Sequence, residues 1–104
     1  MNRKIISALS LARRGGKLEI GFLATKTAVE KNRARVVAVT SDISEGTLKK
    51  IKRVCVERNV DIAYLPITRG DLEKQGMRSI VLCAICDDNF KNLLDKAMRE
   101  AGIC

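Results

Sequence analysis

The side chains that could do acid–base or nucleophilic chemistry in this chain are few. Asp87 and Asp88 form its one pair of adjacent carboxylates, and they stand where an apolar run gives way to a helical pattern. Carboxylates at a helix start accept hydrogen bonds from free N–H groups, so we interpret the pair as a helix cap, with a catalytic pair as the alternative. The 104 residues include no His, which removes Ser-His-Asp triads and the commonest general base. We therefore predict that the protein is not an enzyme and uses no cofactor.

The motif Cys83-Ala-Ile-Cys86 has the spacing of some redox and zinc sites. It lies in the apolar run 80–86, which is typical of a buried strand, and residues three apart in a strand point to opposite faces. A redox pair needs a helix start, and a structural zinc site needs two further ligands nearby. We therefore predict core thiols rather than a metal site, with Cys104, at the chain end, the thiol most open to oxidation.

The charge of the chain is concentrated in its first third. Lys and Arg number 20 and Asp and Glu 12, a net charge of +8; residues 1–35 hold nine basic and two acidic side chains, and residues 36–104 hold eleven and ten. Such a basic segment favours a polyanionic partner, with a merely solubilising surface as the alternative. The three aromatic residues, Phe22, Tyr64 and Phe90, are too few for modules that stack several bases.

No stretch of the sequence resembles a membrane span. The longest apolar run, 80–86, is far shorter than the roughly 20 residues that a bilayer requires. The first 14 residues have a basic start followed by apolar residues, as signal peptides do, but Ser7 and Ser10 interrupt the run and no small-residue cleavage site follows. We expect an amphipathic helix there and a cytoplasmic protein.

Helical and extended patterns alternate along the chain with short connections. Helices are predicted over 2–13, 22–31, 45–58 and 87–101, with a short further helix that begins at Thr68 or Asp71 and ends at Gln75. Strands are predicted over 17–20, 35–40, 60–65 and 79–86. Asp42 and Ser44 are cap candidates for the third helix, and Asn32 and Asn59 are candidate left-handed stops. The pattern predicts one α/β domain over residues 1–104, a sandwich with helices on both faces of a largely buried sheet.

Nearly the whole chain resembles a known family, and the motifs that show this lie in its first half. The run Gly16-Lys17-Leu-Glu-Ile-Gly21, the following helix, and Ser41-Asp42-Ile43-Ser44 are similar to the kink-turn-binding ribosomal proteins of the seven-Ae and thirty-e type. The opening Leu9-Ser-Leu-Ala-Arg-Arg-Gly-Gly-Lys17 is similar to their bacterial YlxQ-like branch. The resemblance implies a three-layer α/β/α sandwich with a four-stranded mixed sheet. It also implies a structured RNA partner, ribosomal or another kink-turn RNA, and association with ribosomes.

The resemblance also implies which residues would contact RNA. They come from the approach to the second helix, from that helix, from the loop after the second strand and from the loop before the last strand, with nearby arginines added as phosphate contacts. The predicted set is Arg13, Arg14, Gly16, Lys17, Gly21, Lys26, Arg33, Arg35, Ser41, Asp42, Ile43, Ser44, Gly76, Met77, Arg78 and Ser79. For each glycine the alternative is a simple turn, and for each basic residue a solvated side chain.

One part of the family pattern is absent. Tight kink-turn binders of the family carry Asn, Glu and Lys at the start of the second helix, where this chain has Leu23, Ala24 and Thr27. Only Lys26 offers a neighbouring substitute. A side chain that hydrogen-bonds a base edge contributes about 1–3 kcal/mol of discrimination between RNAs, so the absence of these three weakens the case for kink-turn preference but not for charge-driven RNA binding. Two functions therefore stay open. One is RNA binding with or without kink-turn preference, and the other is a protein adaptor that uses Phe22 and Leu23 as an apolar contact.

Overall fold

The structure, a computed structural model, describes residues 2–102 and contains every helix and strand predicted from the sequence, in the predicted order. The elements are α1 (Arg3–Arg14), β1 (Leu18–Ile20), α2 (Phe22–Glu30), β2 (Val36–Val39), α3 (Glu45–Arg58), β3 (Ile62–Tyr64), α4 (Arg69–Lys74), β4 (Leu82–Ile85) and α5 (Asp88–Glu100). No helix within the described residues is both long and apolar enough to cross a membrane.

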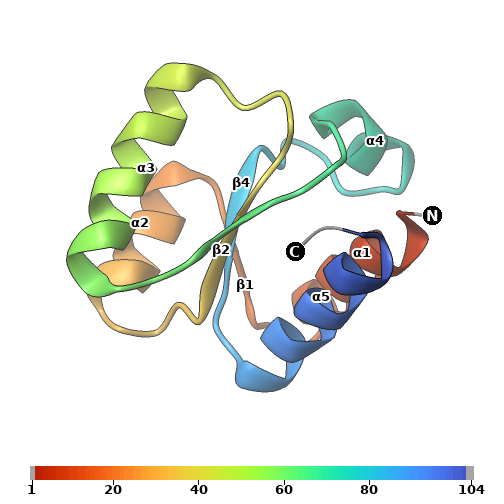
Figure 1. The fold of residues 1–104 in the computed structure, drawn as a ribbon, viewed down its shortest axis with the longest axis horizontal. Coiled ribbons are helices and arrows are strands. Elements are labelled where there is room, and N and C mark those ends of the chain that lie inside the picture. Colours follow the sequence, from red (N-terminus) through yellow and green to blue (C-terminus); the bar gives the residue numbers. More distant parts are fainter. Residues whose placement is uncertain (1, 103–104) are drawn as a thin grey trace.

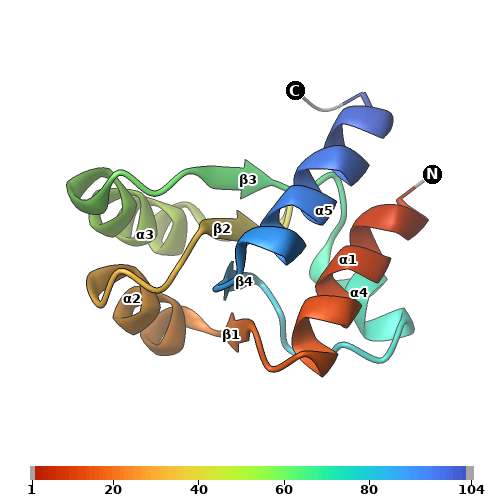
Figure 2. The same ribbon diagram turned by 90° about the horizontal axis from the view of Figure 1, so that it is seen from below.

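The four strands form one mixed sheet between two layers of helices. Their order is β1-β4-β2-β3; β4 is antiparallel to both of its neighbours, and β2 and β3 are parallel. Helices α2 and α3 cover one face of the sheet and α1 and α5 cover the other, as Figures 1 and 2 show. This arrangement confirms the predicted three-layer α/β/α sandwich.

Each face of the sheet contributes to its own hydrophobic core. Alternate residues of β2 and β4 point to opposite faces, so Val36 and Cys83 pack with α1 and α5, whereas Val37 and Ala84 pack with α2 and α3. All residues of both central strands are buried. A sheet covered on both faces needs continuous apolar strands, which is the pattern that the sequence shows.

The differences from the sequence-based boundaries have local causes. The last strand begins at Leu82 rather than at residue 79, because Ser79 has a φ of +60° and turns the chain before it can pair. Leu93 of α5 is 40% exposed and lines a surface hollow together with Ala8 and Leu11 of α1. Asn32 and Asn59 end α2 and α3 in the predicted left-handed conformation, with φ of 59° and 56°.

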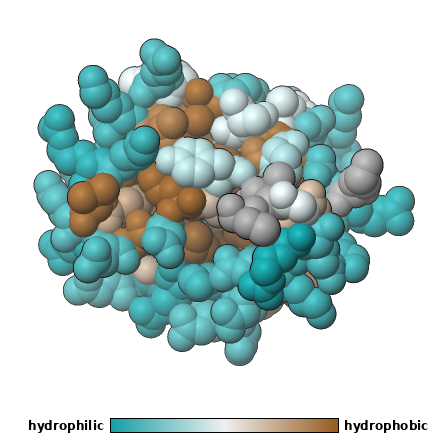
Figure 3. All heavy atoms as spheres, viewed as in Figure 1, coloured by the Kyte–Doolittle hydropathy of each residue, from teal (hydrophilic) through white to brown (hydrophobic). Residues whose placement is uncertain are grey.

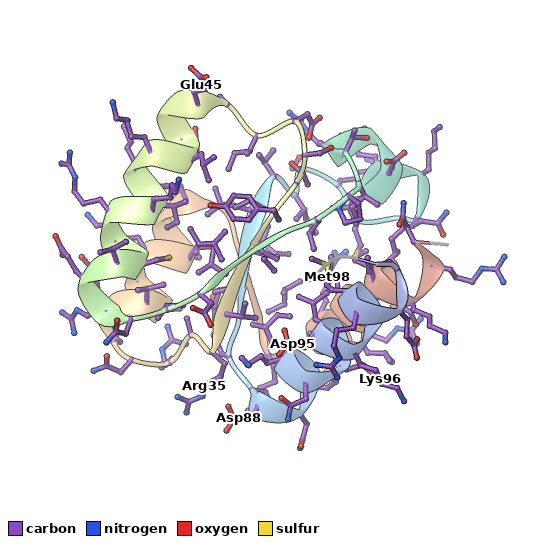
Figure 4. All side chains as sticks on the ribbon, in the orientation of Figure 1. Arg35, Glu45, Asp88, Asp95, Lys96 and Met98 are labelled. Carbon is purple, nitrogen blue, oxygen red and sulfur yellow. The ribbon has the colours of Figure 1, made fainter. Side chains whose placement is uncertain are left out.

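The strand directions give the sheet two chemically different ends. We call the end where β1, β2 and β3 finish and β4 begins the upper edge; segments 21–24, 40–44 and 76–81 lie there. We call the opposite end, with segments 16–17, 32–35 and 86–88, the lower edge. Figure 4 labels Glu45 at the start of α3, near the upper edge, and Arg35 and Asp88 at the lower edge.

Candidate nucleic-acid interface

Helices α1, α2, α3 and α4 begin at or near the upper edge, and the starts of α1 and α2 have no side-chain cap. The start of α3 is capped by the Ser44 hydroxyl, which accepts from the Thr47 N–H at 3.3 Å. The start of α4 has a reciprocal cap between Thr68 and Asp71. Helix α2 begins after Gly21, which has no side chain to accept a hydrogen bond. Its first N–H groups are therefore left for an external acceptor, at the positive end of the helix dipole.

The surroundings of this open N-terminus are partly apolar. Gly21 has a φ of 95°, a conformation that glycine adopts more readily than other residues. Leu23 is 75% exposed beside it, while Phe22 is only partly exposed and packs against the core beneath α2 and α3. Lys26 lies in the second turn of α2, half-buried. The helix start thus offers N–H groups, one apolar side chain and one cation.

The loop between β2 and α3 forms a fixed wall beside this helix start. The Ser41 hydroxyl donates to the Ile67 carbonyl at 3.2 Å, and an Asp42 carboxylate oxygen accepts from the Arg69 N–H at 3.0 Å. Ile43 is half-buried and packs on the core under α3. The polar side chains predicted to contact RNA in this loop are therefore engaged within the protein, which fixes the loop against α4.

Asp42 is held in its charged form by these contacts. The Thr40 hydroxyl, which also lies 3.3 Å from the Val81 carbonyl, and the Arg69 backbone N–H lower the pKa of the Asp42 carboxyl below its usual 3.8. Hydrogen bonds to a carboxylate favour its ionised form. A fixed negative charge therefore stands at the upper edge beside groups that attract anions.

The loop between α4 and β4 completes the upper edge. Arg78 and Ser79 are exposed, and Gly76 and Ser79 have positive φ angles of 83° and 60°. Met77 is only 3% exposed and lies in the core beside α1 and α5. Met77 therefore faces the core, and Arg78 and Ser79 are the exposed side chains that this loop contributes to the predicted contact set.

Helix α1 reaches the same loop from the side. An Arg13 guanidinium N–H donates to the Gly76 carbonyl, with an N···O distance of 3.4 Å. Arg14 and Gln75 line one surface hollow. The structure therefore brings Arg13 and Arg14 of the predicted set beside the loop that contains Arg78.

The other four predicted residues lie at the lower edge. Gly16, Lys17, Arg33 and Arg35 line a shallow hollow of about 220 Å³ together with Glu19, Asn32 and Cys86. Arg33 lies 3.5 Å from a Glu19 oxygen, and Arg35 lies 3.4 Å from an Asp88 oxygen. Arg33 and Arg35 lie apart from the upper-edge residues because α2 carries the chain from the upper to the lower edge and β2 carries it back.

The cysteine thiols are not built for metal or redox chemistry. Burial raises the pKa of Cys83 to about 12 and that of Cys55 to about 11, so both are neutral thiols at ordinary pH. Cys83 and Cys86 face different cores, as predicted, and Cys86 is only half-buried. Among residues 2–102, no three His, Cys, Asp or Glu side chains gather in a way that could hold a metal ion. Cys104 lies outside the described residues.

The open start of α2 was not among the contacts predicted from the sequence. The predicted contacts were side chains, whereas the structure presents unpartnered backbone N–H groups at residues 22–24. The sequence did hold a signal. Gly21 stands at a helix start where Ser, Thr, Asp or Asn would supply a cap, and those residues are present at the starts of α3, α4 and α5.

Comparison with known proteins agrees with the resemblance seen in the sequence. Residues 3–72 match the family described as the ribosomal protein L7Ae/L30e/S12e/Gadd45 family. A Bacillus halodurans protein of unknown function has a similar structure, with a TM-score of 0.82 and 24% identity, over 91% of this chain and 96% of that one. A Giardia lamblia 15.5 kD RNA-binding protein superimposes with a TM-score of 0.73 at 12% identity, over 97% of this chain and 87% of the other.

Proposed function

The chain belongs to the ribosomal protein L7Ae/L30e/S12e/Gadd45 family, and we propose that it is a single-domain RNA-binding protein whose upper edge contacts structured RNA. The family is a ribosomal protein family without catalytic function, which agrees with the prediction that the chain is not an enzyme. The observation that carries the proposal is the uncapped start of α2 at an exposed edge of a basic protein. The RNA-binding name of the Giardia protein with the same fold supports it.

The geometry suits phosphate groups best. Free N–H groups at a helix start and the positive end of its dipole attract anions. Lys26 lies in the second turn of α2 and Arg78 is exposed in the α4–β4 loop, whose Gly76 carbonyl accepts from Arg13. Among the described residues none of these three cations lies within 4 Å of a carboxylate oxygen. Cations without carboxylate partners can approach phosphates without first breaking an ion pair.

Structured RNA fits this surface better than a regular duplex does. A-form RNA has a deep, narrow major groove that side chains cannot read. A sharp bend opens that groove, and a helix start can then approach the phosphates and base edges. We therefore propose a bent RNA of the kink-turn class as the partner, which would place the protein in the cytoplasm in association with ribosomes.

The residues at the α2 start define how selective this binding is. Leu23 and Ala24 have no polar side-chain atoms and Thr27 has only a hydroxyl, so they cannot reproduce the contacts to guanine edges that Asn, Glu and Lys provide. Recognition would then depend on phosphate position and on shape. We expect a preference for kinked over straight RNA of about 5-fold, equivalent to about 1 kcal/mol.

The proposal is tested by titrating the protein with two RNAs at near-physiological salt. One RNA contains a kink-turn with tandem G·A pairs, and the other has the same length with those pairs changed to Watson–Crick. The proposal predicts binding to both and tighter binding to the first. Equal affinities would remove the kink-turn part of the proposal, and binding to neither would remove the RNA-binding function.

One observation favours a second candidate function, a protein-interaction adaptor. Leu23 is 75% exposed at the α2 start, an unusual place for a large apolar side chain. Because Phe22 helps to form the core, Leu23→Ser separates the two functions more cleanly than a Phe22 variant does. An adaptor would lose its partner on this change, whereas an RNA-binding protein that uses phosphates would keep its affinity.

A further inference from the structure

Helix α3 carries a dense set of cations that the proposed interface does not use. Lys49, Lys50, Lys52 and Arg53 are all exposed. Ile51 and Cys55 on the same helix are fully buried against the sheet, so the cations lie on the remaining sides. Figure 3 shows hydrophilic side chains along the α3 side of the molecule, outside the apolar patch near its centre.

The spacing of these cations is unfavourable for the helix alone. Lys49 and Arg53 are four residues apart, and Lys49 and Lys52 are three apart, so their side chains are neighbours on the helix surface. Like charges at these spacings destabilise a helix. An external polyanion would relieve this repulsion.

Within the described part of the chain, the cations of α3 have no carboxylate partners, unlike some of the cations on α1 and α5. Lys4 of α1 pairs with Glu100 at 2.8 Å, and Lys91 of α5 pairs with Asp95 at 2.9 Å. Glu45 and Glu57 stand four residues from Lys49 and Arg53, a spacing that allows ion pairs. Yet no α3 cation lies within 4 Å of a carboxylate oxygen among the described residues.

The position of α3 connects these cations to the proposed interface. The helix begins at Ser44, in the upper-edge loop beside the α2 start, and runs down the same face of the sheet as α2 (Figure 1). Its 14 residues span about 21 Å at 1.5 Å per residue. A stem that leaves an RNA bound at the upper edge can therefore run along this helix.

We propose that the outer face of α3 is a second contact surface, which binds the phosphate backbone of a duplex RNA stem flanking the site at the upper edge. The inference rests on the proposed RNA-binding function and extends it to a second element. Lys49, Lys52 and Arg53 provide the contacts, which are independent of base sequence.

The test uses two variants with the same change in charge. The triple variant K49Q/K52Q/R53Q removes the α3 contacts, and R3Q/K96Q/R99Q removes three exposed cations from the helical layer across the sheet. Each is titrated with a kink-turn RNA that has a long flanking stem and with the same RNA trimmed to a minimal stem. Thermal unfolding checks the fold, and relief of like-charge repulsion should leave the α3 variant at least as stable as the wild type.

The proposal predicts that the α3 variant binds the long-stem RNA about 10-fold more weakly than the wild type, with a salt slope reduced by about 2 to 3. On the minimal RNA its affinity should stay within about 2-fold of the wild type, as should that of the control variant on both RNAs. Equal losses on both RNAs, or no loss beyond the control, would overturn the proposal. Failure of the wild type to bind either RNA would overturn the proposed function and this inference with it.

Discussion

The upper and lower edges of the sheet both contain residues that the sequence predicts to contact RNA, but the two edges differ in chemistry. The lower edge has the denser group of predicted basic residues, with Lys17, Arg33 and Arg35 lining one hollow. The upper edge has fewer cations and a fixed carboxylate at Asp42, yet it contains the uncapped start of α2. The number of cations at an edge is therefore a poor guide to an anion site unless the carboxylates that already pair with them are considered.

Two of the three cations that line the lower-edge hollow already have carboxylate partners. Arg33 and Arg35 each lie within 4 Å of a carboxylate oxygen. Helices α1 and α2 also end near this edge, and the C-terminal end of a helix attracts cations. A phosphate at the lower edge would compete with both, whereas a phosphate at the upper edge would meet N–H groups that have no side-chain cap.

The strongest test of this contrast is a pair of charge reversals, one at each edge. The double variants K26E/R78E and R33E/R35E change the net charge equally. Losing two charge-assisted phosphate contacts should weaken RNA binding by K26E/R78E at least about 30-fold, whereas R33E/R35E should stay within about 3-fold of the wild type. Fluorescence anisotropy with a kink-turn RNA measures both, and the reverse order of effects would assign the interface to the lower edge.

A smaller effect, on the free energy of unfolding, is expected from removing the cap of α5 at the lower edge. The Asp87 carboxylate accepts from the N–H groups of Asn89 and Phe90 at 2.9 and 3.2 Å. Asp87→Ala should lower the free energy of unfolding by about 1 kcal/mol, the usual contribution of such a cap. Urea denaturation measures this loss. RNA affinity should not change, and a marked loss of affinity in the folded variant would show that this edge does more than stabilise the fold.

The smallest expected effect concerns the pH dependence of stability at the upper edge. The pKa of Asp42 is lower in the folded protein than its usual 3.8. Its carboxylate therefore contributes stability above the unfolded-state pKa, and this contribution is lost as pH falls through the folded-state value. Thermal unfolding in acid should show a shallower loss of stability for Asp42→Asn than for the wild type. Parallel curves would show that the Thr40 and Arg69 contacts do not hold this carboxylate.

Local signals in the sequence were sufficient to predict the helices and strands of the fold. Ser44 and Asp87 cap the helices that they were predicted to cap, and Asn32 and Asn59 end theirs, because these roles depend on neighbouring backbone groups. The alternation of side chains along a strand also predicted correctly that Cys83 and Cys86 lie on opposite faces of the sheet. Strand ends were less predictable, since the left-handed Ser79 shortens β4 from within a suitable apolar run.

The interface was harder to predict because it depends on positions in three dimensions. Arg33 and Arg35 are close in sequence to residues of the upper edge, but a helix and a strand separate them from that edge in space. Met77 belongs to the predicted loop, and its burial depends on the backbone conformations of its neighbours. The cations of α3 were not predicted as a binding surface, because the acidic residues of 36–104 nearly cancel the basic residues of that segment in its net charge.

The most direct test of the account is an NMR titration that follows each backbone amide as RNA is added. The account predicts that a kink-turn RNA shifts or broadens the amide signals of Phe22, Leu23 and Ala24 most strongly, with Arg78 next. The signals of Lys17, Arg33 and Arg35 should remain near their free positions. Strong changes at those three residues, with residues 22–24 unaffected, would contradict the assignment of the RNA interface to the upper edge.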